Sequence, residues 1–215
     1  MNIKKRISET INSIPKHIDL VAISKTKSSE EIIQAYDVGQ RIFGENKVQE
    51  MTEKQRVLPS DIHWHMVGHL QRNKVKYIAS YVSLIHSVDS MKLMIEIDKQ
   101  ALRNERIIPC LLQIKIAKET SKFGLSQDDA SKLLENSIKY RNVKIYGLMG
   151  MASLTKDELQ IDNEFKKLKI FFDQLKSKFN HLKILSMGMS SDYKIAIKNG
   201  SNMIRIGSQI FGPRN

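Results

Sequence analysis

The stretch Ile18 to Lys27 reads IDLVAISKTK, an apolar run that stops abruptly at polar residues. This composition predicts a buried strand with Lys25 at its carboxyl end. Because side chains alternate between the two faces of a strand, Val21, Ile23 and Lys25 share one face, and the lysine ends a row of core positions. Two interpretations stay open. A partly desolvated lysine has a neutral amine that can attack a carbonyl, whereas a lysine that simply ends a strand extends its amine into solvent.

Outward from this strand, apolar runs alternate with helical patterns to the end of the chain. Besides 18–24, the predicted strands cover 41–44, 62–68, 82–88, 110–116, 143–149, 182–187 and 203–206. The predicted helices cover 3–14, 28–39, 47–58, 71–81, 90–106, 126–142, 158–179 and 192–198. Capping signals at 28–31, 126–129 and 155–158 mark three of the helix starts.

This alternation of strands and helices favours one fold. Eight strands separated by helices, with no second zone of composition and no linker, predict an α/β protein with a single (β/α)8 TIM barrel over residues 1–215. The length of 215 residues suits one core and is short for two. An open doubly wound sheet is the alternative. The absence of a Gly-x-Gly-x-x-Gly motif after the first strand argues against it.

The composition of the chain limits the kinds of partner that we expect it to bind. The net charge of +12 could indicate nucleic acid, but the lysines are spread over nearly every predicted helix and the chain has one tryptophan. We therefore expect no nucleic-acid partner. Cys110 is the only cysteine, and the sequence opens MNIKKR without an apolar signal core, so we expect a cytoplasmic protein. No run suits a membrane span, and no apolar patch predicts an oligomer, so we expect a monomer.

In a barrel, function lies at the carboxyl ends of the strands. Small residues follow the seventh strand at 186–191 (SMGMSS) and the eighth strand at Gly207 and Ser208. Backbone N–H groups exposed by glycine, together with serine hydroxyls, bind phosphate well. Each loop taken alone is equally compatible with an ordinary turn and a helix cap. Two such loops after strands seven and eight favour a phosphate site, because barrels commonly bind phosphate there.

The histidines suggest a different kind of site. His63 and His65 lie on one face of the third predicted strand, and His69 follows its end. This spacing is compatible with zinc. The other strand ends add only His86, inside the fourth strand, and Asp89, which are few for a catalytic metal centre. We expect no metal site, and we expect His63 or His65 to be a core histidine bonded to a neighbour.

A lysine that can attack a carbonyl and a phosphate site together define a ligand with an aldehyde and a phosphate, which pyridoxal 5′-phosphate satisfies. At this point the sequence resembles a known family, the pyridoxal phosphate homeostasis proteins. The resemblance runs in order over nearly the whole chain. It is carried by AISKTK at 22–27, FGEN at 43–46, WHMVGHLQ at 64–71, GLM at 147–149, LSMGMSSD at 185–192 and RIGSQIFG at 205–212.

The resemblance implies an alanine-racemase-like barrel, fold type III of the pyridoxal phosphate proteins, that carries the cofactor without an established reaction of its own. Carried over by position, the implied cofactor contacts are Lys25 as the Schiff-base lysine, Asn46 beside the ring, Ser190, Gly207 and Ser208 at the phosphate, Arg205 at the pyridine nitrogen, and Lys27, Lys122 and Met189 as secondary candidates. Two departures are visible. Residues 149–151 (MGM) differ from the pair found in many members, and the chain stops at Asn215 without the basic extension of some.

Three functions follow as hypotheses. The first is a carrier that binds pyridoxal 5′-phosphate and maintains intracellular vitamin B6 and amino-acid pools, with apo forms of cofactor-dependent enzymes as candidate partners. The second is a pyridoxal-phosphate-dependent amino-acid racemase or lyase that uses Lys25 as a base. The third is a metal-dependent barrel hydrolase built on the strand-three histidines. We expect the first, and thus no enzyme, because an arginine opposite the ring nitrogen weakens the cofactor as an electron sink.

Overall fold

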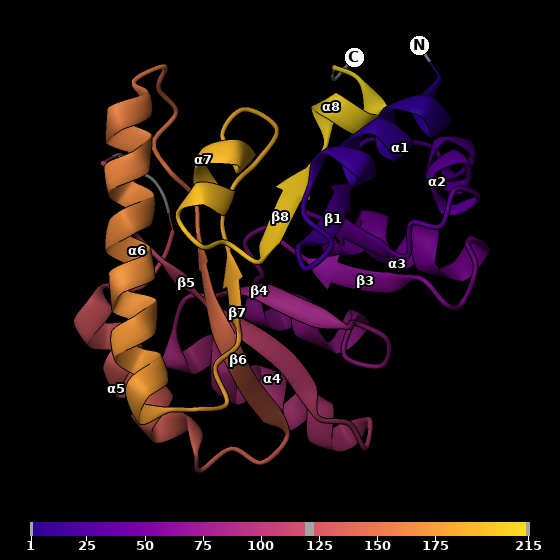
Figure 1. The fold of residues 1–215 in the computed structure, drawn as a ribbon. Helices are drawn as coiled ribbons and strands as arrows, with labels where there is room; N and C mark the ends of the chain where they lie inside the picture. The colour runs from indigo at the N-terminus through magenta and orange to yellow at the C-terminus, as the bar shows by residue number, and fades with distance from the viewer. Residues whose placement is uncertain (1, 119–122, 214–215) are drawn as a thin grey trace.

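The computed structural model describes residues 2–118 and 123–213, and its strands form one closed barrel in the order β1 to β8 (Figure 1). Neighbouring strands are parallel, and β8 returns to pair with β1. The strands are β1 (Asp19–Ile23), β2 (Ile42–Glu45), β3 (His63–Met66), β4 (Leu84–Val88), β5 (Ile108–Ile114), β6 (Val143–Gly150), β7 (Ile184–Ser186) and β8 (Met203–Ile206). The predicted (β/α)8 barrel is therefore confirmed, and its closure excludes the open sheet.

Helices alternate with the strands around the barrel (Figure 1). They are α1 (Ile3–Ser13), α2 (Ser29–Tyr36), α3 (Val48–Val57), the 3-10 helix η1 (Arg72–Tyr77), α4 (Met91–Arg103), α5 (Gln127–Ser137), α6 (Glu158–Lys178), α7 (Tyr193–Lys198) and α8 (Ser208–Phe211). The caps at Ser28 and Ser126 are present, each side chain accepting a hydrogen bond from the backbone three residues on. Asp157 caps α6.

Two predictions about helices were wrong. The segment 71–81 forms the shorter η1, in which Lys74 N–H donates to the Gln71 carbonyl and Ile78 N–H to the Val75 carbonyl. These three-residue steps characterise a 3-10 helix, which rarely extends beyond a few residues. No helix was predicted after the eighth strand, whereas α8 follows β8 directly and begins at Ser208. This short helix lies at the mouth of the barrel beside the loop after β7.

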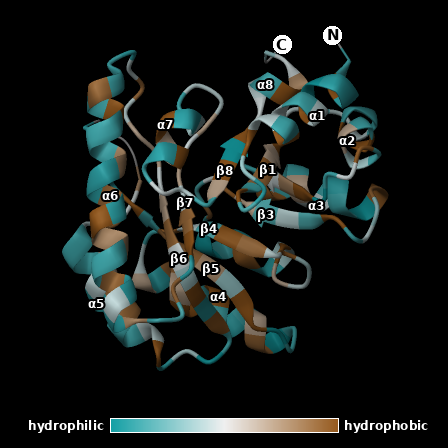
Figure 2. Cartoon of the chain, viewed as in Figure 1, coloured by the Kyte–Doolittle hydropathy of each residue, from teal (hydrophilic) through white to brown (hydrophobic). Residues whose placement is uncertain are grey.

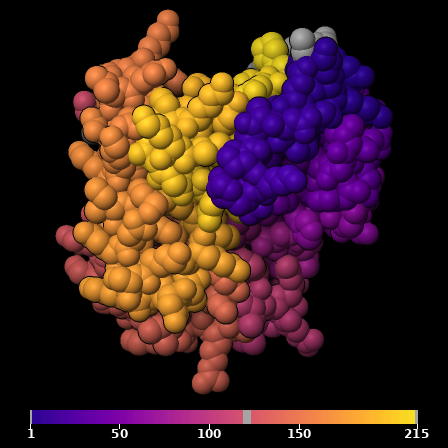
Figure 3. Space-filling view, viewed as in Figure 1, coloured from indigo at the N-terminus to yellow at the C-terminus, as the bar shows by residue number. Residues whose placement is uncertain are grey.

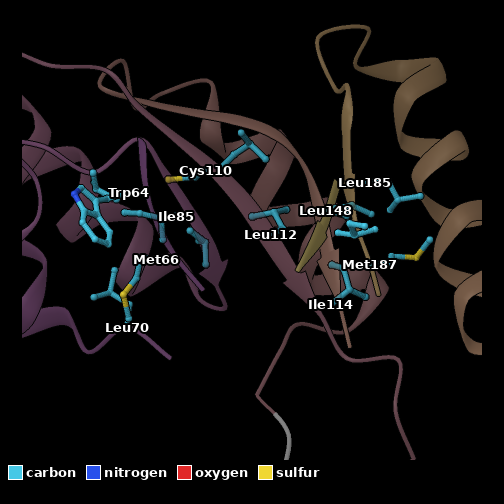
Figure 4. Close-up of a cluster of buried hydrophobic side chains, with 14 of the residues drawn as sticks. Trp64, Met66, Leu70, Ile85, Cys110, Leu112, Ile114, Leu148, Leu185 and Met187 are labelled. Atoms are coloured by element: carbon cyan, nitrogen blue, oxygen red, sulfur yellow. The ribbon is translucent and has the colours of Figure 1, made fainter. Parts of the chain in front are cut away.

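The outward faces of the strands form the main hydrophobic core with the helices. Figure 2 shows hydrophobic colour along the strands and long hydrophilic stretches on helices such as α6. In Figure 4, Trp64, Met66 and Leu70 lie together on one side of the barrel, and Leu185 and Met187 on the other. Cys110 belongs to the same cluster, and burial raises the pKa of its thiol. This cysteine is a packing residue.

The inside of the barrel contains a second, smaller cluster. It consists of Val21, Leu84, Leu111, Met149 and Met203, and we call it the apolar interior cluster. Ile23 packs against it from the carboxyl side. The predicted inward face is therefore confirmed for Val21 and Ile23, as period-two alternation requires, whereas Lys25 lies beyond the end of β1.

The two ends of the chain meet. Figure 3 shows the indigo N-terminal segment against the yellow C-terminal segment, and the Arg6 guanidinium lies close to Gly212. Helix α1 packs against α8 and α2 (Figure 1). Within the described residues, none of the helices combines the length and apolar character needed to cross a bilayer.

Candidate functional site

A pocket of about 640 Å³ opens at the carboxyl ends of the strands. Eight of the candidate residues line it: Lys25, Lys27, Asn46, Met189, Ser190, Arg205, Gly207 and Ser208. Seven of them follow β1, β2, β7 or β8, and Arg205 lies within β8, so residues as far apart in sequence as Lys25 and Ser208 face one volume. Lys122 lies outside the described residues. No tyrosine occurs among the described residues that line the pocket.

Lys25 lies on a tight turn directly after β1. Ser24 N–H continues the ladder to the Gly44 carbonyl, and the Ser24 carbonyl accepts from Lys27 N–H at 3.0 Å, which closes the turn. Thr26 in this turn has φ of 64°, in the left-handed region. Lys27, also on the turn, pairs with Glu31 at 3.4 Å. The turn presents both lysines to the pocket.

Two glycines allow the wall around Asn46 to form. A Cβ at Gly44 would lie 2.6 Å from Ile23 Cδ1, so the glycine makes room for the side chain that ends the row before Lys25. A Cβ at Gly68 would lie 2.3 Å from the Asn46 carbonyl oxygen. The loop after β3 therefore approaches Asn46 more closely than it could if residue 68 had a side chain.

The loops after β7 and β8 are bonded to each other. Ser190 Oγ accepts a hydrogen bond from Gly207 N–H at 3.2 Å. The preceding loop turns at Gly188, whose φ of 93° favours glycine, and Met189 N–H donates to Asp192 Oδ1 at 2.6 Å. Ser208, exposed, opens α8 beside them. Small residues and hydroxyls thus converge on one side of the pocket.

Arg205 reaches the pocket from inside the barrel. It is buried, and its guanidinium donates to Ser186 Oγ at 2.7 Å and to the Gly150 carbonyl at 3.0 Å. Burial lowers the pKa of Arg205 to about 10, and the negative charge of Asp192 opposes that shift. The side chain therefore stays positively charged at neutral pH and can only donate hydrogen bonds.

Two buried histidines extend this network across the barrel. His86 Nδ1 lies 3.3 Å from Ser186 Oγ, and His86 Nε2 lies 3.0 Å from His65 Nδ1. Because Arg205 donates to Ser186, the serine hydroxyl is free to donate to His86, which can then donate to His65. Burial lowers the pKa of His65 to about 3 and holds the pKa of His86 well below its ordinary value. We call Arg205, Ser186, His86 and His65 the polar interior network.

The other histidines do not complete a metal site. His63 is exposed at the start of β3, whereas His69 stands at the pocket rim, 3.1 Å from Asp89 and stacked on Phe123. Among the described residues, no group of three or more histidine, cysteine or acidic side chains could hold a metal ion. The expectation that His65 is a core histidine bonded to a neighbour is confirmed, and the geometry gives the zinc hypothesis no support.

Sequence reasoning missed a buried charged cluster behind the Lys25 turn. Glu45 at the end of β2 is fully buried and accepts from Ser24 Oγ and from Lys54 Nζ, each at 2.7 Å. Lys54 also pairs with Glu50 at 2.7 Å. Burial raises the pKa of Glu45, which Lys54 and Ser24 partly offset. The four-residue spacing of Glu50 and Lys54 on one helix was a visible signal, but their contact with the turn was not.

The donor set of the pocket suits a phosphorylated aldehyde. It offers lysine amines on one side, and serine hydroxyls with backbone N–H groups on another, around a volume large enough for a substituted pyridine. The pocket wall beside these serines is thin at Gly207, since a Cβ at this position would lie 3.3 Å from Ile23 Cβ. The residues present therefore fit pyridoxal 5′-phosphate.

Known proteins resemble this chain over its whole length. The family model described as alanine racemase, N-terminal domain, matches residues 2–215. A pyridoxal phosphate homeostasis protein of Aquifex aeolicus is 35% identical over 226 residues, covering 100% of this chain and 99% of the relative. The structure of PipY from Synechococcus elongatus PCC7942, with PLP bound, is 35% identical with a TM-score of 0.90, covering 98% of this chain and 100% of PipY.

A more distant likeness concerns the fold alone. The alanine racemase of Clostridium difficile 630 is 12% identical, with a TM-score of 0.80 over 99% of this chain and 57% of that chain. The alanine-racemase-like form of the barrel is thereby confirmed. The racemase is much longer, and its remaining length has no counterpart in the alignment with this chain.

Proposed function

Because the chain belongs to the family of pyridoxal phosphate homeostasis proteins, built on the alanine racemase N-terminal domain, we propose that it binds pyridoxal 5′-phosphate in the pocket at the carboxyl end of its barrel. The observation that carries the proposal is the convergence of Lys25, Ser190 and Ser208 on one 640 Å³ volume. PipY, which has the same fold, has been determined with PLP bound.

Each residue has a proposed task. When bound, the cofactor supplies an aldehyde that reacts with amines and a pyridine ring that withdraws electrons. Lys25 supplies the amine that attaches it, and Asn46 and Met189 bound the space beside the ring. Ser190, Gly207 and Ser208 hold the phosphate through hydroxyls and backbone N–H groups. We assign Arg205 to the ring nitrogen and Lys27 to a secondary role. Lys122 remains a secondary candidate.

We further propose that the chain carries the cofactor in homeostasis and does not turn over amino acids. Arg205 is protonated at neutral pH, so it cannot leave a proton on the ring nitrogen, and this limits electron withdrawal. Racemisation also needs a base on each side of the substrate. No tyrosine lines the described part of the pocket, and Tyr193 is buried at the start of α7. Apo forms of cofactor-dependent enzymes are the proposed recipients, and a monomer stays our expectation.

Lysine replacement tests the binding proposal. We expect Lys25→Ala to abolish the visible absorbance band and the borohydride-trapped adduct, while the protein stays folded because its core is untouched. Lys27→Ala, on the same turn, is the matched control and should keep the adduct. Peptide mass spectrometry identifies the modified lysine. A stoichiometric adduct on another lysine in Lys25→Ala would show that the attachment site is wrong.

Proton exchange tests the carrier proposal against the racemase alternative. The loaded protein is incubated in D2O with L-alanine and a panel of other amino acids, and α-proton exchange and D-isomer formation are followed. We expect negligible turnover, because each positioned acid or base contributes about 10²- to 10⁴-fold and no tyrosine lines the described part of the pocket to act opposite Lys25. Exchange with D-isomer formation faster than about 1 s⁻¹, in the ordinary enzyme range, would make the protein a racemase.

A further inference from the structure

The turn that carries Lys25 is held from behind by three charged side chains. Glu45 accepts the Ser24 hydroxyl, Lys54 donates to the Ser24 carbonyl at 2.8 Å, and Glu50 accepts Thr26 N–H at 2.5 Å. These bonds fix the hydroxyl and the carbonyl oxygen of Ser24 and the backbone N–H of Thr26, the two residues that flank Lys25. We call Glu45, Glu50 and Lys54 the charged latch.

Lys54 is the centre of the latch. Its ammonium has three protons, and three oxygens lie within 2.8 Å of it: the Ser24 carbonyl, Glu45 Oε1 and Glu50 Oε1. Its side chain is only 8% exposed, and that of Glu45 is fully buried. Burying such charges is costly, and apolar side chains of similar size often serve stability equally well. The arrangement therefore indicates a task other than stabilisation.

The task is suggested by the backbone of Thr26. Its φ of 64° lies in the left-handed region, which β-branched residues rarely adopt. The bond from Lys27 N–H to the Ser24 carbonyl places Thr26 third in the turn, the position where a turn with positive φ ordinarily has glycine or asparagine. Threonine adopts this conformation only if the surroundings impose it, and Glu50 is the side chain that binds its N–H.

We propose that Glu45, Glu50 and Lys54 are positioning residues that hold the strained turn and thereby aim the Lys25 amine into the pocket. This inference rests on the proposed attachment of the cofactor at Lys25. Without the latch, Thr26 relaxes toward negative φ, the peptide planes on both sides of Lys25 rotate, and the amine leaves the direction of the pocket. The loops proposed to hold the phosphate follow β7 and β8 and contain no latch residue, so phosphate binding does not change.

The experiment separates attachment from binding. Attachment is the rate at which each purified apoprotein forms a borohydride-trapped adduct with pyridoxal 5′-phosphate. Binding is the Kd for pyridoxine 5′-phosphate, which has an alcohol in place of the aldehyde and cannot bond to Lys25. For Glu50→Ala we expect attachment to slow roughly 10- to 100-fold, the scale of a misplaced reacting group, with an unchanged Kd. Glu50→Gln, which keeps an oxygen acceptor, should lose less.

A second substitution tests the strain directly. Glycine adopts positive φ without a steric penalty, so Thr26→Gly in the Glu50→Ala background should recover part of the attachment rate. The matched control is Asp98→Ala, because Asp98 on α4 likewise accepts a backbone N–H, that of Asn142 at 2.8 Å, but at the amino end of β6. Urea unfolding of every variant ensures that rates are compared on folded protein.

The outcomes divide clearly. Slow attachment in Glu50→Ala with normal binding of pyridoxine 5′-phosphate, partly restored by Thr26→Gly, supports the latch. Attachment at the parent rate in Glu50→Ala, an equal loss in Asp98→Ala, or no recovery with Thr26→Gly overturns it. If the unsubstituted protein binds neither ligand, the proposed function is wrong and the latch with it. This outcome is distinct from failure of the latch alone, because it is seen before any residue is replaced.

Discussion

The barrel interior contains two groups of side chains that differ in kind. The apolar interior cluster of Val21, Leu84, Leu111, Met149 and Met203 lines no part of the described pocket. The polar interior network runs from His65 through His86 and Ser186 to Arg205, which does line it. Apolar side chains would fill the space of the polar interior network at a lower desolvation cost. The difference indicates that the network is retained for the pocket and the cluster for the fold.

The largest effect is expected on cofactor binding, from substitutions in the phosphate loops that leave both interior groups unchanged. Ser190→Ala combined with Ser208→Ala should weaken pyridoxal 5′-phosphate binding by a few kcal/mol, since two charge-assisted hydrogen bonds of about 1.5 to 3 kcal/mol each are lost. Pyridoxal without its phosphate should bind almost as before. Titration of both ligands measures the difference, and an equal loss for both would place the phosphate elsewhere.

The apolar interior cluster should affect stability alone. Leu111→Ala should lower the free energy of unfolding by about 2 to 5 kcal/mol, because the side chain is fully buried and leaves a cavity. Leu111→Met, which conserves volume, should cost less than about 1.5 kcal/mol. Urea unfolding gives both values. A weaker Kd for pyridoxine 5′-phosphate in the folded Leu111→Ala protein would contradict the separation of the two groups.

The polar interior network should affect both properties. Ser186→Ala removes the acceptor of Arg205 and the partner of His86, and leaving buried polar groups unpaired costs about 1 to 3 kcal/mol of unfolding free energy. It should also change the absorbance spectrum of the loaded protein, because Arg205 loses its orientation. Ser186→Thr, which keeps the hydroxyl, is the control. A stability loss with an unaltered spectrum would give the network a purely structural role.

The smallest effect is a dependence of stability on pH. The pKa of His65 is about 3 in the folded protein and ordinary when unfolded, so below pH 6.5 the unfolded chain binds a proton that the folded chain does not. Acidification therefore destabilises the fold, by up to about 1.4 kcal/mol per pH unit for this histidine. Urea unfolding between pH 7 and pH 5 should show a shallower slope in His65→Gln than in the parent.

The control for this slope is the neighbouring histidine on the same strand. His63 is exposed, so His63→Gln should keep the slope of the parent. Charged groups common to all three proteins cancel in the comparison. Equal slopes for His65→Gln and the parent would show that His65 titrates normally and that the network is open to water.

The sequence by itself determined the succession of elements and the residues that end them. Burial alternates locally, with period two in strands and about 3.6 in helices, so eight strands and the inward positions of Val21 and Ile23 could be predicted from short windows. The rule that barrel sites lie at the carboxyl ends then gathered Lys25, Asn46, Ser190 and Gly207 around one pocket. The segment 71–81 was mispredicted because its buried Val75, Ile78 and Ala79 recur at spacings of three and four residues, which fit an α-helix as well as a 3-10 helix.

Only the tertiary structure decided which polar side chains meet inside the barrel. Ser186 and His86 are 100 residues apart, and Lys54 reaches the Ser24 carbonyl across 30 residues. Such contacts depend on strand tilt, register and the reach of long side chains, none of which has a local sequence period. The left-handed Thr26 is the sharpest case: its own residue type predicts a negative φ, whereas in the structure its φ is positive and its N–H donates to Glu50 of α3, a residue 24 positions away.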